Sequence, residues 1–413
     1  MGKIGRIRLR VLVPIVFLAS LTISAGAAQL TTGTLTETRK SALVNALSHM
    51  QHSDGSFQDS STDIQRCLVS TAEAAIIIRT LGSNINSTID AEKCKQYIVE
   101  QINLTRDLGV MQKIVLFSEY FDLKLNRSSV IQFVLSRYNE SGAFYEQGGR
   151  CYFRIDGLDY RTAYSNPNIV STFLAVDILS RLNALEEINV TKTIAWIVSC
   201  KTANGFKPFP EVIFPYPFSV DFYDIGVPYT YCGISALKTL GHLDDCINDV
   251  DRHNMSSYIL ICYDGFKHGF RIHRDAASYE TELYYSLYAV ETLHSLRVLE
   301  QTETMNIIRD VANHLVEEQK MRVHGWPIPA TEGYYGLFCE FEDTITGSYE
   351  AVRILQLASM LHLLDSATPR AISTIVNLMV FSFLVTAIPV GVPYALKLAY
   401  NRYKEVKANP IGT

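Results

Sequence analysis

The chain has 413 residues, of which 48% are hydrophobic, and a formal net charge of −5 at pH 7. Four of its 37 basic residues precede residue 28 and four follow residue 370, which leaves 29 basic against 41 acidic side chains between those points. Such an acidic central region argues against nucleic acid or an anionic lipid surface as its partner, and the apolar fraction is large enough for an extensive core.

Residues 1–27 have the pattern of a secretory signal peptide. Basic residues up to Arg10 precede an apolar run from Val11 to Ile23, and the small residues Ala25, Gly26 and Ala27 suit a cleavage site. The alternative is an uncleaved membrane anchor, for which a run of about 13 apolar residues is short. We therefore expect the folded domain to span residues 28–364.

Twelve segments between residues 37 and 363 carry apolar residues at helical spacing. Amphipathic segments alternate with segments that are apolar almost all round. The amphipathic segments are 37–51, 90–102, 126–138, 187–200, 248–262 and 303–320. The apolar segments are 67–81, 108–120, 168–182, 228–240, 280–296 and 348–363.

A helix that is apolar all round must be buried, whereas an amphipathic helix can cover it from outside. The alternation therefore predicts an all-α fold with almost no sheet. We expect an α/α toroid of six helical hairpins, with an inner and an outer ring. An open solenoid is the alternative, but it would need polar capping repeats, which the first and last units lack.

A glycine followed by an aromatic residue recurs where an amphipathic segment ends. The aromatic residues are Phe57, Phe144, Phe206, Phe266 and Trp326, and the last three intervals are 62, 60 and 60 residues. A period of this size indicates repeated supersecondary units. The first interval, 87 residues, holds two units if the turn between residues 104 and 109 has lost its aromatic residue. The links that follow the turns are long, which favours them as binding loops at one end of the ring.

Residues 371–396 carry no charge over 26 positions, longer than the about 20 that a membrane-spanning helix needs. A short linker, residues 365–370, precedes them, and a basic tail, residues 397–413, follows. The positive-inside rule places this tail in the cytoplasm. We expect a single-pass protein of the cell membrane, held there by its C-terminal helix, with the N-terminal domain outside.

Six sequons favour an exported glycoprotein. They lie at Asn86, Asn103, Asn126, Asn139, Asn189 and Asn254. The eight cysteines could form disulfides outside the cell, but their pairing does not follow from the sequence. A free buried thiol is an equally good interpretation of Cys232.

Two segments resemble the prenyltransferase/squalene-cyclase repeat family, and most closely the β subunits of protein prenyltransferases. Residues 159–164, DYRTAY, resemble the family's D-x-R-x-x-Y, and residues 229–237, YTYCGISAL, resemble its G-Y-T-F-C-G-L-A-A-L. The resemblance covers about residues 37–363 and implies an α/α toroid. Candidate residues of its funnel or ligand-binding site are Asp159, Arg161, Tyr164, Tyr229, Tyr231, Arg274 and Tyr284.

The chain departs from the family at the metal site. The family holds zinc with Asp-x-Cys and a later His, and the matching positions here are Glu280, Glu282 and Glu350. Zinc favours thiolate and imidazole ligands, so this carboxylate set would suit Ca²⁺ or Mg²⁺ and disfavours zinc. The alternative is three ordinary first-turn carboxylates that stabilise a helix N-terminus. No other cofactor is expected.

The diphosphate site is also depleted. Arg161 and Arg274 match basic positions of the family, but Gly226 and Ala277 stand where it has His and Lys. A diphosphate needs several converging cations, and the D-x-D-D acid motif of squalene cyclases is absent from the sequence. The sequence therefore favours a non-catalytic module that binds a protein, peptide, glycan or lipid at its loop-rich end.

Two enzymatic alternatives stay open. One is a transferase or cyclase of the prenyltransferase/terpene-cyclase repeat class, and the other is a carboxylate-based glycoside hydrolase. Further candidates are loop histidines that could be solvated or bind a metal, and an aromatic, proline-rich stretch, residues 206–223, that could line a groove or serve packing. The histidines are His268, His273 and His324.

Overall fold

The computed structural model describes residues 38–57, 64–83, 88–146, 166–210, 225–276, 283–319 and 344–366. Contacts divide the chain into two units, Ala42–Leu364 and a second that joins Met1–Ser41 to Asp365–Thr413. Within the described ranges no helix is long and apolar enough to cross a membrane. The expected signal peptide, residues 1–27, and the expected membrane helix, residues 371–396, lie outside those ranges, so both stay predictions.

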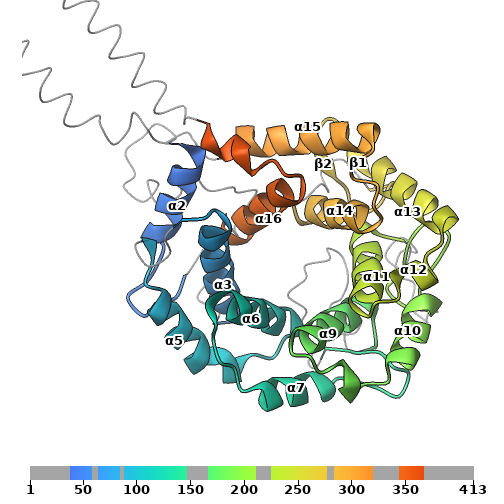
Figure 1. Ribbon diagram of the computed structural model, residues 1–413, viewed down its shortest axis with the longest axis horizontal. Coiled ribbons are helices and arrows are strands. Elements are labelled where there is room, and N and C mark those ends of the chain that lie inside the picture. The colour runs from blue at the N-terminus through green and yellow to red at the C-terminus, as the bar shows by residue number, and fades with distance from the viewer. Residues whose placement is uncertain are drawn as a thin grey trace, which may run out of the picture. The chain divides into compact units, whose positions relative to one another are not determined.

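Six helices form an inner ring in the unit Ala42–Leu364 (Figure 1). They are α3 (Ile64–Thr80), α6 (Leu108–Phe121), α9 (Ile169–Arg181), α11 (Val227–Thr239), α14 (Leu283–Ser295) and α16 (Thr344–Leu357). Each packs against the next, and α16 packs against α3. The ring is therefore closed, which confirms the predicted toroid and rules out an open solenoid for this unit.

Six further helices surround this ring (Figure 1). They are α2 (Arg39–His49), α5 (Ala91–Gln101), α7 (Arg127–Leu135), α10 (Val190–Ser199), α13 (Asp249–Ile261) and α15 (Thr302–Glu318). Short helical turns complete the links: η1 (Ile102–Leu104), η2 (Leu185–Glu187), α12 (Leu243–Cys246) and η6 (Leu361–Asp365). The strict alternation of the sequence thus corresponds to outer and inner positions.

Helix ends are set by local chemistry. Asn168 caps α9 by accepting a hydrogen bond from the Ser171 backbone N–H at 2.8 Å, and Asp90 caps α5 in the same way through Lys93. The last inner helix departs most from prediction, since it starts at Thr344 and ends at Leu357 rather than spanning 348–363. A left-handed residue, Ser359 with φ of +58°, stops it early.

Three of the glycine–aromatic turns share one construction. The backbone N–H of the aromatic residue donates to a threonine hydroxyl on the following inner helix, and each phenylalanine is fully buried. The pairs are Phe57 with Thr71 at 2.9 Å, Phe144 with Thr172 at 3.1 Å, and Phe206 with Thr230 at 3.2 Å. Each turn is therefore attached to the inner helix that follows it.

The same turns also join neighbouring outer helices. The side chain of Gln51, at the end of α2, bonds both backbone groups of Asp90, the cap of α5. Likewise Tyr138, after α7, contacts the backbone of Asn189, the cap of α10. These two repeats thus hold the start of the next outer helix, a connection that the sequence pattern alone did not reveal.

The fourth turn corrects the sequence analysis. The repeat pattern gives Phe266 as its aromatic residue, but Phe266 is 82% exposed, while Phe270 is fully buried like Phe57, Phe144 and Phe206. The Phe270 N–H donates to Ser286 Oγ at 3.0 Å, as its counterparts do. The turn is longer here because β1 (Tyr263–Asp264) pairs antiparallel with β2 (Gly269–Phe270). The residue equivalent to Phe206 in this repeat is therefore Phe270 and not Phe266.

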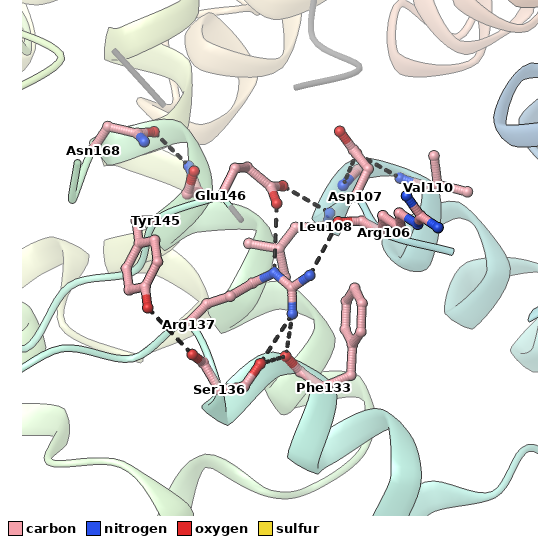
Figure 2. A network of polar contacts seen from close by, with 12 residues as sticks. Arg106, Asp107, Leu108, Val110, Phe133, Ser136, Arg137, Tyr145, Glu146 and Asn168 are labelled. Carbon is pink, nitrogen blue, oxygen red and sulfur yellow. Dashed lines mark hydrogen bonds and ion pairs between the residues drawn. The ribbon is translucent and has the colours of Figure 1, made fainter. Parts of the chain in front are cut away.

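The second repeat has lost its aromatic turn, as the long first interval predicted, and two buried side chains, Glu146 and Arg137, occupy the place (Figure 2). Glu146 accepts a hydrogen bond from the Leu108 N–H at 2.7 Å, and Arg137 donates to the Arg106 carbonyl at 3.0 Å. The two side chains approach to 3.5 Å and are 0% and 4% exposed. They satisfy backbone groups that a full hairpin would otherwise pair.

Burial controls the ionisation of this pair. It raises the pKa of Glu146 from the usual 4.5 to about 9, and nearby Asp107 adds to that shift. The Leu108 N–H and Arg137 oppose the shift without cancelling it. Burial also lowers the pKa of Arg137. Desolvation of the charged forms therefore outweighs their mutual attraction.

Candidate functional site

Five of the ten candidate site residues lie outside the described residues. They are Asp159, Arg161, Tyr164, Glu280 and Glu282. Of the others, Arg274 forms an exposed ion pair at 3.0 Å with its neighbour Asp275, after β2. Glu350 is partly exposed on α16. In the part of the chain that the structure describes, no three His, Cys, Asp or Glu side chains are placed to hold a metal ion.

Three predicted tyrosines lie on two adjacent inner helices. Tyr229 on α11 is buried, with 4% of its surface exposed. Tyr231 on α11 and Tyr284 on α14 are partly exposed and meet through Tyr288, which stacks on Tyr231 with ring centroids 4.7 Å apart. Tyr284 lies edge-on to Tyr288 at 6.0 Å. The structure therefore unites Tyr231 and Tyr284 in one aromatic group.

A band of side chains that the sequence did not predict bridges every pair of neighbouring inner helices. We call it the inner-ring belt. Its members are Glu73, Gln112, Lys113, Glu119, Phe173, Asp177, Arg181, Tyr231, Tyr288, Glu291, Thr346 and Arg353. The sequence held one sign of this belt, namely a single acidic residue within each of three otherwise apolar helices. A buried carboxylate needs a partner, so each of these acids implied a polar contact.

The belt closes the ring between its first and last helices. Glu73 on α3 is 1% exposed, pairs with Lys113 on α6 at 2.8 Å, and accepts from Thr346 on α16 at 2.7 Å. The Lys113 ammonium also lies 3.9 Å from the ring centre of Tyr349. Burial alone would lower the pKa of Lys113, but Glu73 and Tyr349 raise it above its usual value, so Lys113 stays charged.

Two further ion pairs belong to the belt. Arg181 on α9 contacts Asp177 at 2.9 Å and Glu119 on α6 at 2.6 Å. Arg353 on α16 contacts Glu291 on α14 at 3.0 Å. Despite opposing burial, these carboxylates raise the pKa of both arginines. Every basic side chain of the belt is thus bound by a carboxylate.

An aromatic arc completes the belt between α9, α11 and α14. Phe173 meets Tyr231 edge to face at 5.2 Å, and Tyr231 in turn stacks on Tyr288. Burial raises the pKa of Tyr231 well above its usual value, and the adjacent Glu291 adds to the effect. The Tyr231 hydroxyl therefore stays protonated and can act as a hydrogen-bond donor.

The loop histidines lie elsewhere. His268 Nδ1 is 2.7 Å from Asp310 on α15, and the His314 ring centre is 4.8 Å from that of His268. Hydrogen bonds from His268 and then Tyr263 lower the pKa of Asp310. These contacts fasten the β1–β2 hairpin to α15. His273 is partly exposed in the loop that follows, and His324 lies outside the described residues.

The cysteines that the structure describes form no disulfide. They are Cys67, Cys94, Cys200, Cys232, Cys246 and Cys262. Burial raises the pKa of Cys94 and of Cys262 to about 12, so these thiols are protonated and unreactive at neutral pH. For Cys232, which is buried, the structure favours the free thiol over a disulfide.

Comparisons with known proteins agree with this geometry. A solved structure of a variant of the type II terpene cyclase MstE from Scytonema, in complex with geranylgeranyl dihydroxybenzoate as substrate, is similar with a TM-score of 0.50 at 11% identity. The match covers 78% of this chain and 97% of that one. It shows a common fold and nothing about substrate.

Protein geranylgeranyltransferase-I from Candida albicans is more distant, with a TM-score of 0.35 and 13% identity over 61% of this chain and 85% of that one. A comparison with curated proteins finds no match. The sequence model of the prenyltransferase alpha-alpha toroid domain matches residues 15–113 and 110–325. Because this match spans well over half of the chain, the protein belongs to the prenyltransferase alpha-alpha toroid family.

Proposed function

We propose that this toroid is a non-catalytic binding module for a polar ligand. The observation that carries the proposal is the pairing of the belt's basic side chains, since Lys113, Arg181 and Arg353 each lie within 3.0 Å of a carboxylate. Binding and activating a diphosphate takes several cations that converge on it. In this belt those cations would first have to leave their carboxylates.

A second reason concerns the hydrocarbon chain of an isoprenoid. Such a chain would bring the ion pairs of the belt into contact with apolar groups, and the loss of hydration of a charge is expensive. Glu291 and Arg353 still have 19% and 36% of their side-chain surface accessible. A polar ligand can replace the water lost there, whereas a prenyl chain cannot.

The test uses geranylgeranyl diphosphate with the purified full-length protein in detergent. We expect no conversion by mass spectrometry, with and without Mg²⁺ or Zn²⁺, and no binding below the millimolar range by calorimetry. Turnover, or micromolar binding, would show that the enzyme alternative, a transferase or cyclase of this repeat class, is correct. Metal analysis of the same sample should find no stoichiometric zinc.

We also propose that the module is displayed outside the cell by a C-terminal membrane helix. The uncharged run 371–396 and the basic tail after it support this. The sequons alone are weaker support, because Asn126 and Asn189 also cap α7 and α10. Protease digestion of intact cells should remove the toroid and spare the tail, and protection of the toroid would contradict this topology.

A further inference from the structure

We propose that the side of α11, α14 and α16 that faces the ring axis binds an uncharged carbohydrate. This inference rests on the proposed binding function and assigns it a ligand class. It depends on three properties of these helices: where their accessible side chains face, how the aromatic residues are held, and how the charges are balanced.

The accessible side chains of these helices face the ring axis or its ends. Each helix packs against an outer helix, α10, α13 or α15, and against inner neighbours on both flanks. Along the length of each helix, the one side that no neighbouring helix covers is therefore the side that faces the ring axis. Nearly all side chains that keep accessible surface on these helices are polar or aromatic, and Leu357 at the end of α16 is the one aliphatic exception among those described.

The aromatic residues form a rigid group. Tyr231 and Tyr288 are nearly parallel, with 11° between their ring planes, and Tyr284 lies 4.1 Å from Tyr285 between ring centres. Side chains that hold one another in this way lose little conformational entropy when a ligand binds. Aromatic rings also pack well against the C–H faces of a sugar ring, and a tyrosine hydroxyl can bond its hydroxyl groups.

The charges beside these rings are balanced. The Glu291 carboxylate holds Arg353 at 3.0 Å and lies close enough to Tyr231 to raise its pKa. A ligand with a net charge would have to break this pair or leave its own charge unpaired. An uncharged ligand with many hydroxyl groups can instead bond the remaining donors and acceptors of both partners. An oligosaccharide combines this chemistry with flat apolar faces.

The experiment is titration calorimetry of the full-length protein in a glycan-free detergent. The probes are maltohexaose, chitohexaose and mannohexaose, with a sialylated hexasaccharide as the charged comparison. We expect at least one neutral hexasaccharide to bind with a Kd below 1 mM, and the charged one to bind at least tenfold more weakly. Failure of all three neutral probes to bind at 10 mM overturns the proposal.

Variants locate the site. We expect Tyr284→Ala to weaken binding at least tenfold and Tyr284→Phe to weaken it less than threefold, because phenylalanine keeps the ring. Phe266→Ala, on the outer hairpin, is the control and should bind as the wild type does. Thermal unfolding of each variant verifies its fold. If Tyr284→Ala does not fold, binding is measured instead with the double variant Glu291→Gln and Arg353→Gln. Wild-type affinity in a folded Tyr284→Ala variant, or in the double variant Glu291→Gln with Arg353→Gln, would overturn the site assignment.

The outcomes separate the two proposals. If neutral sugars fail but a peptide library binds, and geranylgeranyl diphosphate is neither bound nor converted, the carbohydrate assignment is wrong and the binding function stands. If geranylgeranyl diphosphate is converted, both proposals are wrong.

Discussion

Thr346 in the last inner helix donates a hydrogen bond of 2.7 Å to Glu73 in the first, although 273 positions separate them in the chain. The same carboxylate holds Lys113 of the second inner helix at 2.8 Å. One buried glutamate therefore joins three helices at the point where the ring closes. A contact between residues so far apart in the chain requires the ends of the ring to meet, which makes Glu73 a sensitive probe of closure.

Replacing Glu73 by Ala should destabilise the fold by about 3–5 kcal/mol, because it leaves Lys113 as an uncompensated charge in a largely buried place. Urea unfolding followed by circular dichroism measures the change. The double variant Glu73→Gln with Lys113→Met removes both charges and should recover at least half of the loss. Equal destabilisation by the single and double variants would show that the ion pair is not the cause.

Phe270 and Phe266 provide a direct test of the corrected repeat. Phe270→Ala removes a fully buried ring and should cost about 3–5 kcal/mol of unfolding free energy. Phe266→Ala changes a side chain that is 82% exposed and should change stability by less than about 0.5 kcal/mol. Denaturant melts of both variants suffice. If Phe266→Ala lost more unfolding free energy than Phe270→Ala, Phe266 would be the core aromatic residue of this repeat, as the sequence pattern indicated.

Glu146 should make stability depend on pH. Its pKa is raised to about 9 in the folded protein, so between about pH 4.5 and 9 the folded state binds a proton that the unfolded chain has released. Stability due to this group is therefore complete below pH 4.5 and is lost as the pH rises toward 9, by up to about 1.4 kcal/mol per pH unit.

The Glu146→Gln variant removes this titration and keeps an oxygen that can accept from Leu108. Chemical unfolding at several pH values should show the wild type losing stability relative to the variant from pH 5 to pH 8. Glu100→Gln, at an exposed position on α5, is the control and should follow the wild type. Parallel curves for wild type and Glu146→Gln would contradict the raised pKa.

The sequence predicted the rings because burial follows helical periodicity, and that pattern is local. A helix such as α3 is buried on all sides from Cys67 to Ile78, so it had to be placed in the inner ring. The aromatic of the fourth turn was misplaced because Phe266 and Phe270 both follow a glycine, at Gly265 and Gly269. Only the β1–β2 pairing decides which ring is buried.

The inner-ring belt could not be predicted from the sequence, for a different reason. A single acid in an apolar helix, such as Asp177 in α9, implies a polar partner, but the neighbouring sequence does not identify which residue that partner is. Its partners include Gln112, which lies 65 positions away on α6. Helix orientation within a closed ring determines such pairs, so they emerge only when the register of all six inner helices is known.

Gly142 should tolerate alanine less well than Gly241, although both have positive φ, +91° and +77°. A Cβ on Gly142 would lie 2.8 Å from the backbone carbon of Lys192 in α10, whereas one on Gly241 meets nothing within 4 Å. Gly241→Ala therefore carries only the cost of a left-handed alanine, about 1–2 kcal/mol. Gly142→Ala adds a clash that would push the turn away from the next outer helix. Thermal unfolding should show the larger loss for Gly142→Ala, and equal losses would mean that the turn does not hold α10 in place.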